Sequence, residues 1–303
     1  MKASVLELQI KELPLFKRGK VREVYDLGEN LLLFSTDRIS AFDHVLPVGI
    51  PNKGCILNSI SSYWFKKTKH IVPNHFITDQ VKDYPKVLTP YLEILDGRSM
   101  IVKKAQLIEI ECVVRGYLAG SAWKEYREKR TIAGEKQPAG LGESAKLIKP
   151  LFTPAIKASF GHDENISVLE MMRIVGEDIG LDLAKYSLAL YQFASESALL
   201  QGLILADTKF EFGIDKDGNI ILIDELLTPD SSRYWRFQDY KPGQSQPGFD
   251  KQIVRDYLES LGWDKKPPAP LLPENIIQLT SEKYEELLRS LTQEAVLHGS
   301  LDT

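Results

Sequence analysis

The sequence predicts an α+β protein with two lobes, and three observations support this prediction. The chain has 303 residues, which is long for a single hydrophobic core, so two lobes are expected. Residues 1–110 read mostly as strands, whereas helical patterns begin near Ser121. Strands and helices do not alternate regularly, as they would in a parallel βαβ sheet. We therefore expect a β-rich N-terminal lobe over residues 1–110 and a larger mixed lobe with C-terminal helices over residues 111–303.

Composition narrows the class of protein. Hydrophobic residues make up 43% of the chain and charged residues 26%, which is ordinary for a soluble globular protein. The net charge of −4 argues against a protein that coats nucleic acid. Cys55 and Cys112 form no CxxC pair, which suits a reducing compartment. No apolar run approaches the ~18 residues of a membrane span, and the N-terminus lacks the apolar core of a signal peptide. We expect a cytoplasmic protein without a membrane or nucleic-acid partner.

The N-terminal part contains three β-rich stretches. "VREVYDL" (21–27) and "NLLLFSTD" (30–37) read as strands joined by a turn at Gly28. "MIVKKAQLIEIECVVR" (100–115) reads as one longer β-rich stretch, because apolar and acidic residues alternate from Ile108 onward.

Helical patterns dominate the second part. "SAWKEYREKR" reads as a helix, and "ISVLEMMRIVGEDIG" and "LAKYSLALYQFASESALLQG" read as two more, with Asp163 or Asn165 capping the former. Between them, residues 137–165 are rich in Pro and Gly and read as a long irregular loop. "TPDSSRYW" reads as a polar loop, and "FDKQIVRDYLESLG" and "SEKYEELLRSLTQEAV" read as C-terminal helices.

A charged hairpin is predicted over residues 206–225, "ADTKFEFGIDKDGNIILIDE". Asp217 and Gly218 suit a two-residue turn, and counting outward places Glu211 opposite Asp224. A four-residue loop gives the same register, whereas three or five residues would not. One face then carries the apolar residues Phe210, Phe212, Ile214, Ile221 and Ile223, and the other face carries Asp207, Lys209, Glu211 and Asp224.

Two interpretations of the charged face are open. Directly opposed carboxylates are destabilising unless a positive charge lies between them, either Lys209 or a divalent cation. Mg²⁺ is typically held by one or two carboxylates together with substrate phosphates. The simpler interpretation is a solvent-exposed face of an edge hairpin. The loop that follows, with Asp230 and Arg233, favours a binding site, because binding residues collect in loops beside rigid elements.

Two polar segments of the N-terminal part are further candidates. In "FKRGKVREVY" the basic residues around Gly19, Lys20 among them, suit a phosphate, although an exposed basic strand start is the more common meaning of such a run. In "STDRISAFD" the side chains of Asp37, Arg38 and Ser40 suit either a sugar-phosphate or a turn stabilised by its own polar side chains.

A third segment, "ECVVRGYLAGSAWKEY", places a charged residue directly after an apolar strand. Arg115 is followed by Gly116, and Gly120 precedes Ser121 at the expected helix start. Arg is suited to bidentate contact with phosphate or carboxylate. The alternative is a capped helix with a structural ion pair.

Six segments, in this order, resemble the SAICAR synthetase family, the phosphoribosylaminoimidazole-succinocarboxamide synthases of purine biosynthesis. They are "RGKVREVYDL", "STDRISAFD", "CVVRGYLAGSAWKEY", "FTPAIKA" with "HDENIS", "LADTKFEFG" and "LIDELLTPDSSRYW". The resemblance covers about residues 18–265, and the chain looks like the longer monofunctional form.

The resemblance implies an ATP- and Mg²⁺-dependent ligase with a two-lobed fold related to the ATP-grasp and kinase architecture. ATP would activate the carboxylate of carboxyaminoimidazole ribonucleotide, and the amine of L-aspartate would then form the amide. A nucleotide site in the first lobe, a substrate and metal site in the second, and a monomer rather than an oligomer are expected.

The resemblance also assigns roles to individual residues, each carried over onto the matching position. It assigns Lys209 and Asp207 to catalysis, Glu211 and Asp224 to the metal, and Lys20, Lys104 and Glu111 to ATP, with the last two on one strand beside the nucleotide. The residues expected to bind the ribonucleotide are Ser40, Arg115, Ser121, Asp230 and Arg233.

The sequence departs from the family pattern at two positions and leaves alternatives for the activity. Ile156 and Ser159 stand where the family usually has Thr and Glu, so no aspartate site is assigned. An ATP-dependent small-molecule kinase of related architecture would need the same cleft and metal pair. A nucleotide-binding module without catalysis is disfavoured by the presence of Lys209, Glu211 and Asp224.

Overall fold

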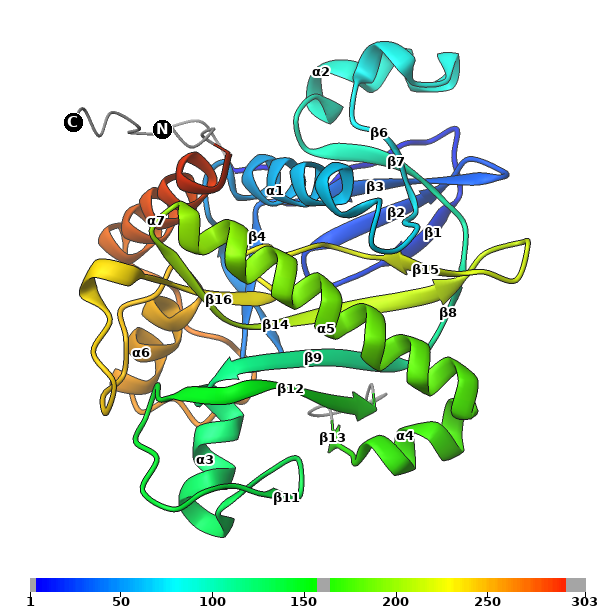
Figure 1. Cartoon of the computed structure of the whole chain (residues 1–303). Helices are drawn as coiled ribbons and strands as arrows, with labels where there is room; N and C mark the ends of the chain where they lie inside the picture. Colours follow the sequence, from blue (N-terminus) through cyan, green and yellow to red (C-terminus); the bar gives the residue numbers. More distant parts are fainter. Residues whose placement is uncertain (1–3, 157–163, 293–303) are drawn as a thin grey trace, which may run out of the picture.

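The computed structural model describes residues 4–156 and 164–292, and it contains two antiparallel sheets with helices packed around them (Figure 1). The α+β prediction is confirmed. One sheet has five strands and comes from the N-terminal part, and the other has seven and comes from the rest of the chain. No helix among the described residues is long and apolar enough to cross a membrane.

The N-terminal sheet has the strand order β1-β2-β3-β7-β6. Its strands are β1 (Leu15–Arg18), β2 (Arg22–Asp26), β3 (Asn30–Ser35), β6 (Phe76–Thr78) and β7 (Ser99–Lys103). A separate hairpin is formed by β4 (Arg38–Ala41) and β5 (His44–Gly49), and α2 (Leu92–Leu95) precedes β7. The strands predicted at 21–27 and 30–37 are confirmed as β2 and β3.

Helix α1 (Lys53–Thr68) was not predicted, because the whole region reads as β. The helix has no clean apolar stripe. Its buried residues include Lys53, Asn58, Ser61 and Ser62 alongside Ile60 and Trp64, so polar side chains interrupt the helical period.

The C-terminal sheet is built around one long strand, β14 (Leu203–Ile214). The main order is β13-β12-β9-β14-β15, and β8 and β16 also pair with β14. The other strands are β8 (Gln106–Leu107), β9 (Ile110–Tyr117), β12 (Lys146–Ile156), β13 (Glu164–Asn165), β15 (Ile220–Ile223) and β16 (Ser232–Arg236). The strand β9 leads into α3 (Gly120–Lys129), and β10 (Thr131–Ile132) and β11 (Glu135–Lys136) form a small ribbon after it.

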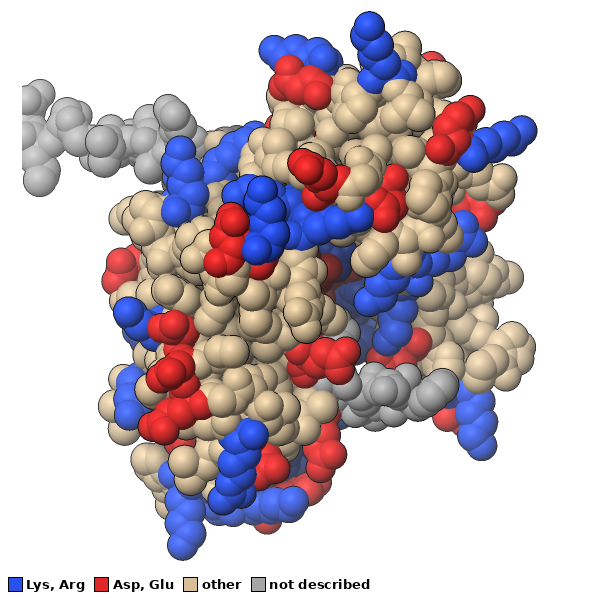
Figure 2. Space-filling view, turned by 90° about the vertical axis from the view of Figure 1, so that its right-hand side faces the viewer, with Lys and Arg blue, Asp and Glu red and all other residues tan. Residues whose placement is uncertain are grey.

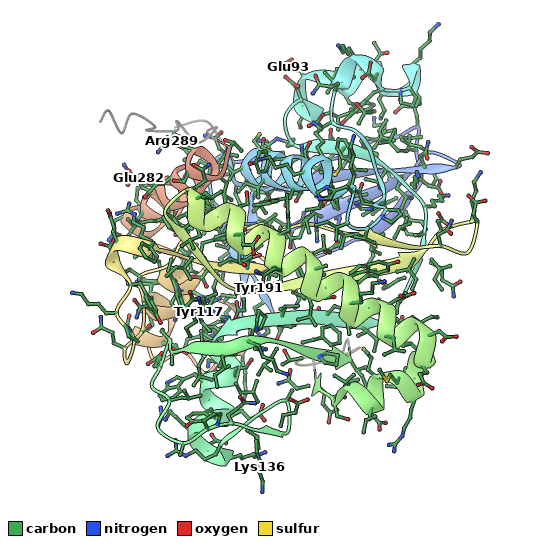
Figure 3. The ribbon with its side chains drawn as sticks, viewed as in Figure 1. Glu93, Tyr117, Lys136, Tyr191, Glu282 and Arg289 are labelled. Atoms are coloured by element: carbon green, nitrogen blue, oxygen red, sulfur yellow. The ribbon has the colours of Figure 1, made fainter. Side chains whose placement is uncertain are left out.

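Helix α5 (Glu177–Leu200) lies across one face of this sheet (Figure 1). Tyr191 points from α5 toward the sheet near Tyr117, as Figure 3 shows, and its hydroxyl donates a hydrogen bond of 2.6 Å to the carbonyl of Leu205 on β14. The shorter α4 (Val168–Val175) precedes α5, and α6 (Gln252–Ser260) and α7 (Glu274–Thr292) close the chain.

Several predicted boundaries are wrong. The irregular loop expected at 137–165 contains β12, which pairs with β9 through Ala155↔Glu111, so a Pro-rich composition concealed a strand. The stretch 100–115 is three strands rather than one. The polar loop 228–235 contains most of β16. Ser167, not Asn165, caps α4, and Asp163 lies outside the described residues. The helices predicted at 121–130 and 249–262 are confirmed, and so is the one predicted at 281–296 as far as residue 292, beyond which it lies outside the described residues.

The register of the β14–β15 hairpin differs by one residue from the prediction. Glu211 pairs with Ile223, not Asp224, and the last pair is Ile214↔Ile220. The connection therefore has five residues, and the Asp215 carboxylate holds it by accepting from the backbone N–H of Asn219 at 2.9 Å. Because strand side chains alternate, the slip exchanges the two faces of β15. Ile220 and Leu222 pack on the core in place of Ile221 and Ile223.

One hydrophobic cluster joins both sheets. It includes Ile56, Ile60 and Trp64 of α1 together with Phe210 and Phe212 of β14. The lobe boundary expected at residue 110 falls on the first residue of β9 and stays a prediction. The shared core holds both sheets in place around the charged side chains described below.

Candidate active site

The charged residues of β14 lie on the face of the sheet away from α5. Alternation places Asp207, Lys209 and Glu211 on the same side of the strand. The neighbouring strand β9 is in register through Asp207↔Arg115 and Phe210↔Cys112. The surface of the molecule on the side of the β14–β15 hairpin has a hollow, and basic and acidic side chains surround it (Figure 2).

Lys209 lies between two carboxylates. Its Nζ is 2.7 Å from Glu111 Oε1 and 2.9 Å from Glu211 Oε1. Continuing the β9–β14 register by one step places these two glutamates opposite each other. The cross-strand carboxylate pair therefore exists, but its members are Glu111 and Glu211 rather than Glu211 and Asp224. Burial alone would lower the pKa of Lys209, but Glu211, Glu111 and Asp224 outweigh it and raise the pKa, so the ammonium stays charged.

Asp224 approaches the same cluster from the end of β15. Its backbone has a φ of 69°, in the left-handed region that non-glycine residues rarely adopt. Arg22 of β2 holds the carboxylate, with Nη2 2.6 Å from Asp224 Oδ2 and 3.7 Å from Glu225 Oε1. Burial would lower the pKa of Arg22, but Asp224 and Glu225 outweigh it. This contact brings the N-terminal sheet to the charged face of β14.

The carboxylates around Lys209 suit a metal cation that takes some of its ligands from a phosphate. Among the described residues, no group of three or more His, Cys, Asp and Glu side chains is arranged to hold a metal ion by itself. Glu111 and Glu211 nevertheless both reach one cationic atom, Lys209 Nζ. Mg²⁺ commonly uses one or two carboxylates and takes its other ligands from water and substrate phosphates. The donor set therefore fits Mg²⁺ together with a phosphate-bearing ligand, and it does not fit a metal bound by protein ligands alone.

A second cluster surrounds Asp207. Arg115 Nη1 is 3.4 Å and Arg233 Nη1 is 2.5 Å from Asp207 Oδ2. Arg115 also donates to Ser121 Oγ at 3.2 Å and to Thr153 Oγ1 at 3.0 Å. The structure thus brings together four residues predicted to bind or process the ribonucleotide.

A cavity of about 460 Å³ opens beside this cluster. Gly120, at its wall, has a φ of 57°, and a Cβ there would lie 2.5 Å from Arg233 Nη2, so glycine is required. The charged side chains that line the cavity are four basic ones, Lys124, Arg127, Arg233 and Arg255, and three acidic ones, Glu143, Asp250 and Glu259. Its size and its excess of cations suit a small phosphorylated ligand.

Asp230 lies in a third cluster, which the sequence reasoning did not anticipate. Lys53 Nζ is 2.8 Å and Lys251 Nζ 3.0 Å from Asp230 Oδ2, and the Tyr284 hydroxyl donates to Oδ1 at 2.9 Å. Burial would raise the pKa of Asp230, but Lys251 and Lys53 outweigh it and hold the pKa well below its usual range. Lys251 also reaches Ser40 Oγ at 3.5 Å.

Nothing in the local sequence singles out Lys53 or Lys251. Lys53 follows a turn-like "IPN", and Lys251 stands in a polar "FDKQ" before a helix, so both look like surface lysines. In the fold the Lys53 side chain is fully buried and that of Lys251 is 12% exposed.

Of the lysines predicted to bind ATP, Lys20 is exposed and Lys104 is partly exposed, and each is paired with an aspartate. Lys20 Nζ is 2.5 Å from Asp43 Oδ1, and Lys104 Nζ is 2.7 Å from Asp26 Oδ1. Lys104 follows β7 and Glu111 lies on β9, so the expectation that they share one strand is wrong. Lys104 instead borders a cavity of about 440 Å³.

The side chains of two residues of "STDRISAFD" make structural contacts with distant segments of the chain rather than with their own turn. Asp37 is buried and accepts hydrogen bonds from the Gly54 N–H at 2.8 Å and from Arg98 at 3.1 Å. Arg38 is occupied by backbone carbonyls and Glu23. Ser40 remains beside Lys251 at the Asp230 cluster.

Comparison with known proteins points to one enzyme family. A family model described as SAICAR synthetase matches residues 15–270. The phosphoribosylaminoimidazole-succinocarboxamide synthase of Thermodesulfovibrio yellowstonii is 53% identical over 292 residues, which is 96% of this chain and 100% of that protein.

Solved structures agree with this. "SAICAR-synthase from Saccharomyces cerevisiae complexed SAICAR" matches with a TM-score of 0.87 and 41% identity, over 97% of this chain and 100% of that chain. "SAICAR synthetase (Type-2) in complex with ADP" has a TM-score of 0.68 at 24% identity, over 93% of this chain and 98% of that chain, and is similar in fold. The resemblance found in the sequence is thereby confirmed. The chain belongs to the SAICAR synthetase family, whose members are ligases of purine biosynthesis.

Proposed function

We propose that this ligase joins L-aspartate to the carboxylate of 5-amino-1-(5-phosphoribosyl)imidazole-4-carboxylate, with ATP and Mg²⁺, to form the succinocarboxamide, ADP and phosphate. The observation that carries the proposal is the pair of charge clusters on one face of β14. The cluster around Lys209 suits a metal-bound nucleotide, and that around Asp207 suits a sugar-phosphate. The relative that is 41% identical, whose structure is described as a complex with SAICAR, supports the choice of substrate.

The ribonucleotide is proposed to occupy the cavity beside Arg115 and Arg233. Both guanidinium groups bind Asp207, which keeps their planes in place before the ligand arrives. Ser121, at the start of α3, adds a hydroxyl next to Arg115. We further propose that Ser40 and Asp230 complete the site, with Asp230 acting through Lys251.

ATP is proposed to bind on the other side of Lys209, with Lys20 and Lys104 toward its phosphates and Glu111 beside it. Glu211 and Asp224 are the proposed magnesium ligands, and the geometry adds Glu111 as a candidate because it faces Glu211 across the strands. When bound, Mg²⁺ would neutralise charge on the phosphate oxygens. The more distant structure of this fold is described as a complex with ADP. ADP is the product expected if ATP is cleaved between its β and γ phosphates.

The proposed reaction has two steps. An oxygen of the imidazole carboxylate attacks the γ-phosphorus, the bond to ADP breaks, and an acyl phosphate forms. The aspartate amine then attacks the acyl carbon, loses a proton and expels phosphate. Lys209, which its carboxylate neighbours keep protonated, offers a fixed positive charge where negative charge passes between the substrates.

A cytoplasmic, monomeric enzyme is proposed as well.

One assay distinguishes this reaction from its alternatives. The protein is incubated with ATP, Mg²⁺ and the carboxylated ribonucleotide, with and without L-aspartate, and ADP release is measured. Release that requires aspartate and yields the amide supports the ligase. Release without aspartate that leaves a stable phosphorylated product identifies a small-molecule kinase instead. If no condition gives turnover, the protein is a binding module and the proposed reaction is wrong.

A further inference from the structure

The turn between β1 and β2 is held from within the protein by Arg38. The turn is closed by a hydrogen bond of 2.8 Å from the Gly19 N–H to the carbonyl of Arg22. Arg38, the first residue of β4, donates from Nε to the carbonyl of Lys20 at 2.9 Å and from Nη2 to that of Gly19 at 3.1 Å. The guanidinium group therefore holds two consecutive carbonyls of the turn.

The remaining bonds of Arg38 tie the turn to the body of the protein. Nη1 donates to the carbonyl of Leu6 at 2.5 Å and to Glu23 Oε1 at 2.9 Å. Glu23 is fully buried, and its other oxygen accepts from the Leu8 N–H at 2.9 Å. All three guanidinium nitrogens are engaged, and the Arg38 side chain is only 13% exposed.

This arrangement has a consequence for an anion near the turn. Carbonyl oxygens carry partial negative charge and would repel a phosphate, and Arg38 both neutralises and immobilises two of them. The Lys20 side chain is 51% exposed and paired with Asp43 rather than with these carbonyls. A cavity of about 580 Å³ lies beside the turn, and Arg18, Gly19, Lys20 and Arg38 are among the residues that line it.

We propose that Arg38 is a positioning residue for the phosphate-binding turn: it does not bind the nucleotide but fixes Gly19 and Lys20 so that Lys20 can. The proposal rests on the proposed function to the extent that Lys20 contacts ATP. It explains why the position has a guanidinium group, since a planar fork can bind several carbonyls at fixed angles and an ammonium group cannot.

The test is a double-mutant cycle between Arg38 and Lys20. Arg38→Lys keeps the charge and removes the fork, and we expect the KM for ATP to rise on the order of 10-fold, with the KM for the ribonucleotide and for aspartate unchanged within about twofold. Lys20→Met should raise the KM for ATP as well. Because one residue acts through the other, the double variant should match Lys20→Met. Fully additive effects, or equal rises in all three KM values, would overturn the proposal.

Hydrogen exchange of the free enzyme separates this proposal from the assignment of Lys20 to ATP. Peptides covering residues 15–24 should exchange faster in Arg38→Lys than in the wild type and be unchanged in Lys20→Met. Arg173→Lys is the matched control, because its side chain is 76% exposed and, within the described part of the chain, is paired with Glu170 on the same helix. Unchanged exchange in Arg38→Lys would overturn the positioning role. Faster exchange together with an unaltered KM for ATP in Lys20→Met would instead remove Lys20 from the nucleotide site.

Discussion

At the scale of single residues, the site depends on how charges are paired. The Lys209 side chain is partly buried, with 28% of it exposed, and two glutamates at 2.7 and 2.9 Å supply its counter-charge. The sequence indicated a carboxylate pair beside this lysine but named the wrong partner. The connection has five residues rather than the expected two or four, so Asp224 is out of register with Glu211, and β9 supplies Glu111 in its place.

The first prediction concerns this pair. Glu111→Gln should lower kcat by at least about 100-fold, as much as Glu211→Gln, because removing one preorganised charged group typically has an effect of this size. Steady-state rates measured over a range of Mg²⁺ concentrations check it, and partial recovery at high Mg²⁺ is expected if the glutamate binds the metal. Glu109→Gln is the control, since Glu109 is exposed two residues away. Wild-type rates in both Glu111→Gln and Glu211→Gln would rule out the metal assignment.

At the scale of secondary-structure elements, the site depends on β14 being covered on one face and charged on the other. Helix α5 covers the apolar face, and its approach is close where Gly116 of β9 faces Tyr191. The periodicity of β14 was evident in the sequence. Its hairpin partner β15 was also predicted, but β8 and β9 were not, because their pairing with β14 joins segments about 100 residues apart in the chain.

The second prediction tests this close approach. A Cβ at Gly116 would overlap the Tyr191 hydroxyl, which donates to the carbonyl of Leu205 two residues before Asp207. Gly116→Ala should therefore destabilise the protein by roughly 1–3 kcal/mol, the usual effect of overpacking a core, as measured by denaturant unfolding. Adding Tyr191→Phe should recover part of the loss by removing the overlapping oxygen. A double variant that is less stable than Gly116→Ala would contradict this account.

At the scale of the whole molecule, buried polar contacts join parts that are distant in the sequence. Arg22 of the first sheet binds Asp224 at the end of β15. Asp230 joins α1 through Lys53, the start of α6 through Lys251, and α7 through Tyr284. The loop that carries Asp230 is therefore held by contacts with three helices.

The third prediction concerns this junction. Lys53→Met should lower the free energy of unfolding by about 2 kcal/mol, the value for a hydrogen bond to a charged group, because Asp230 keeps Lys251 and Tyr284 as partners. Lys66→Met is the matched control on the same helix. Its salt bridge with Asp79 is 3.0 Å long but the lysine is 53% exposed, so a loss below about 1 kcal/mol is expected. Equal losses of unfolding free energy in the two variants would show that burial of the Asp230 junction does not add to its contribution to stability.

The sequence by itself determined the fold class, the family and the residue types of the site. Alternation along β14 is a local property of the chain, and six ordered motifs identify a family without any knowledge of contacts. The tertiary structure alone decided which charges meet. Glu111 lies opposite Glu211 because β9 and β14 pair, Lys53 is a buried partner of Asp230 because α1 packs beside that loop, and Arg38 supports the Gly19–Lys20 turn from the next hairpin. Each of these depends on strand register or helix packing between segments distant in the chain, and such pairings leave no local pattern to read.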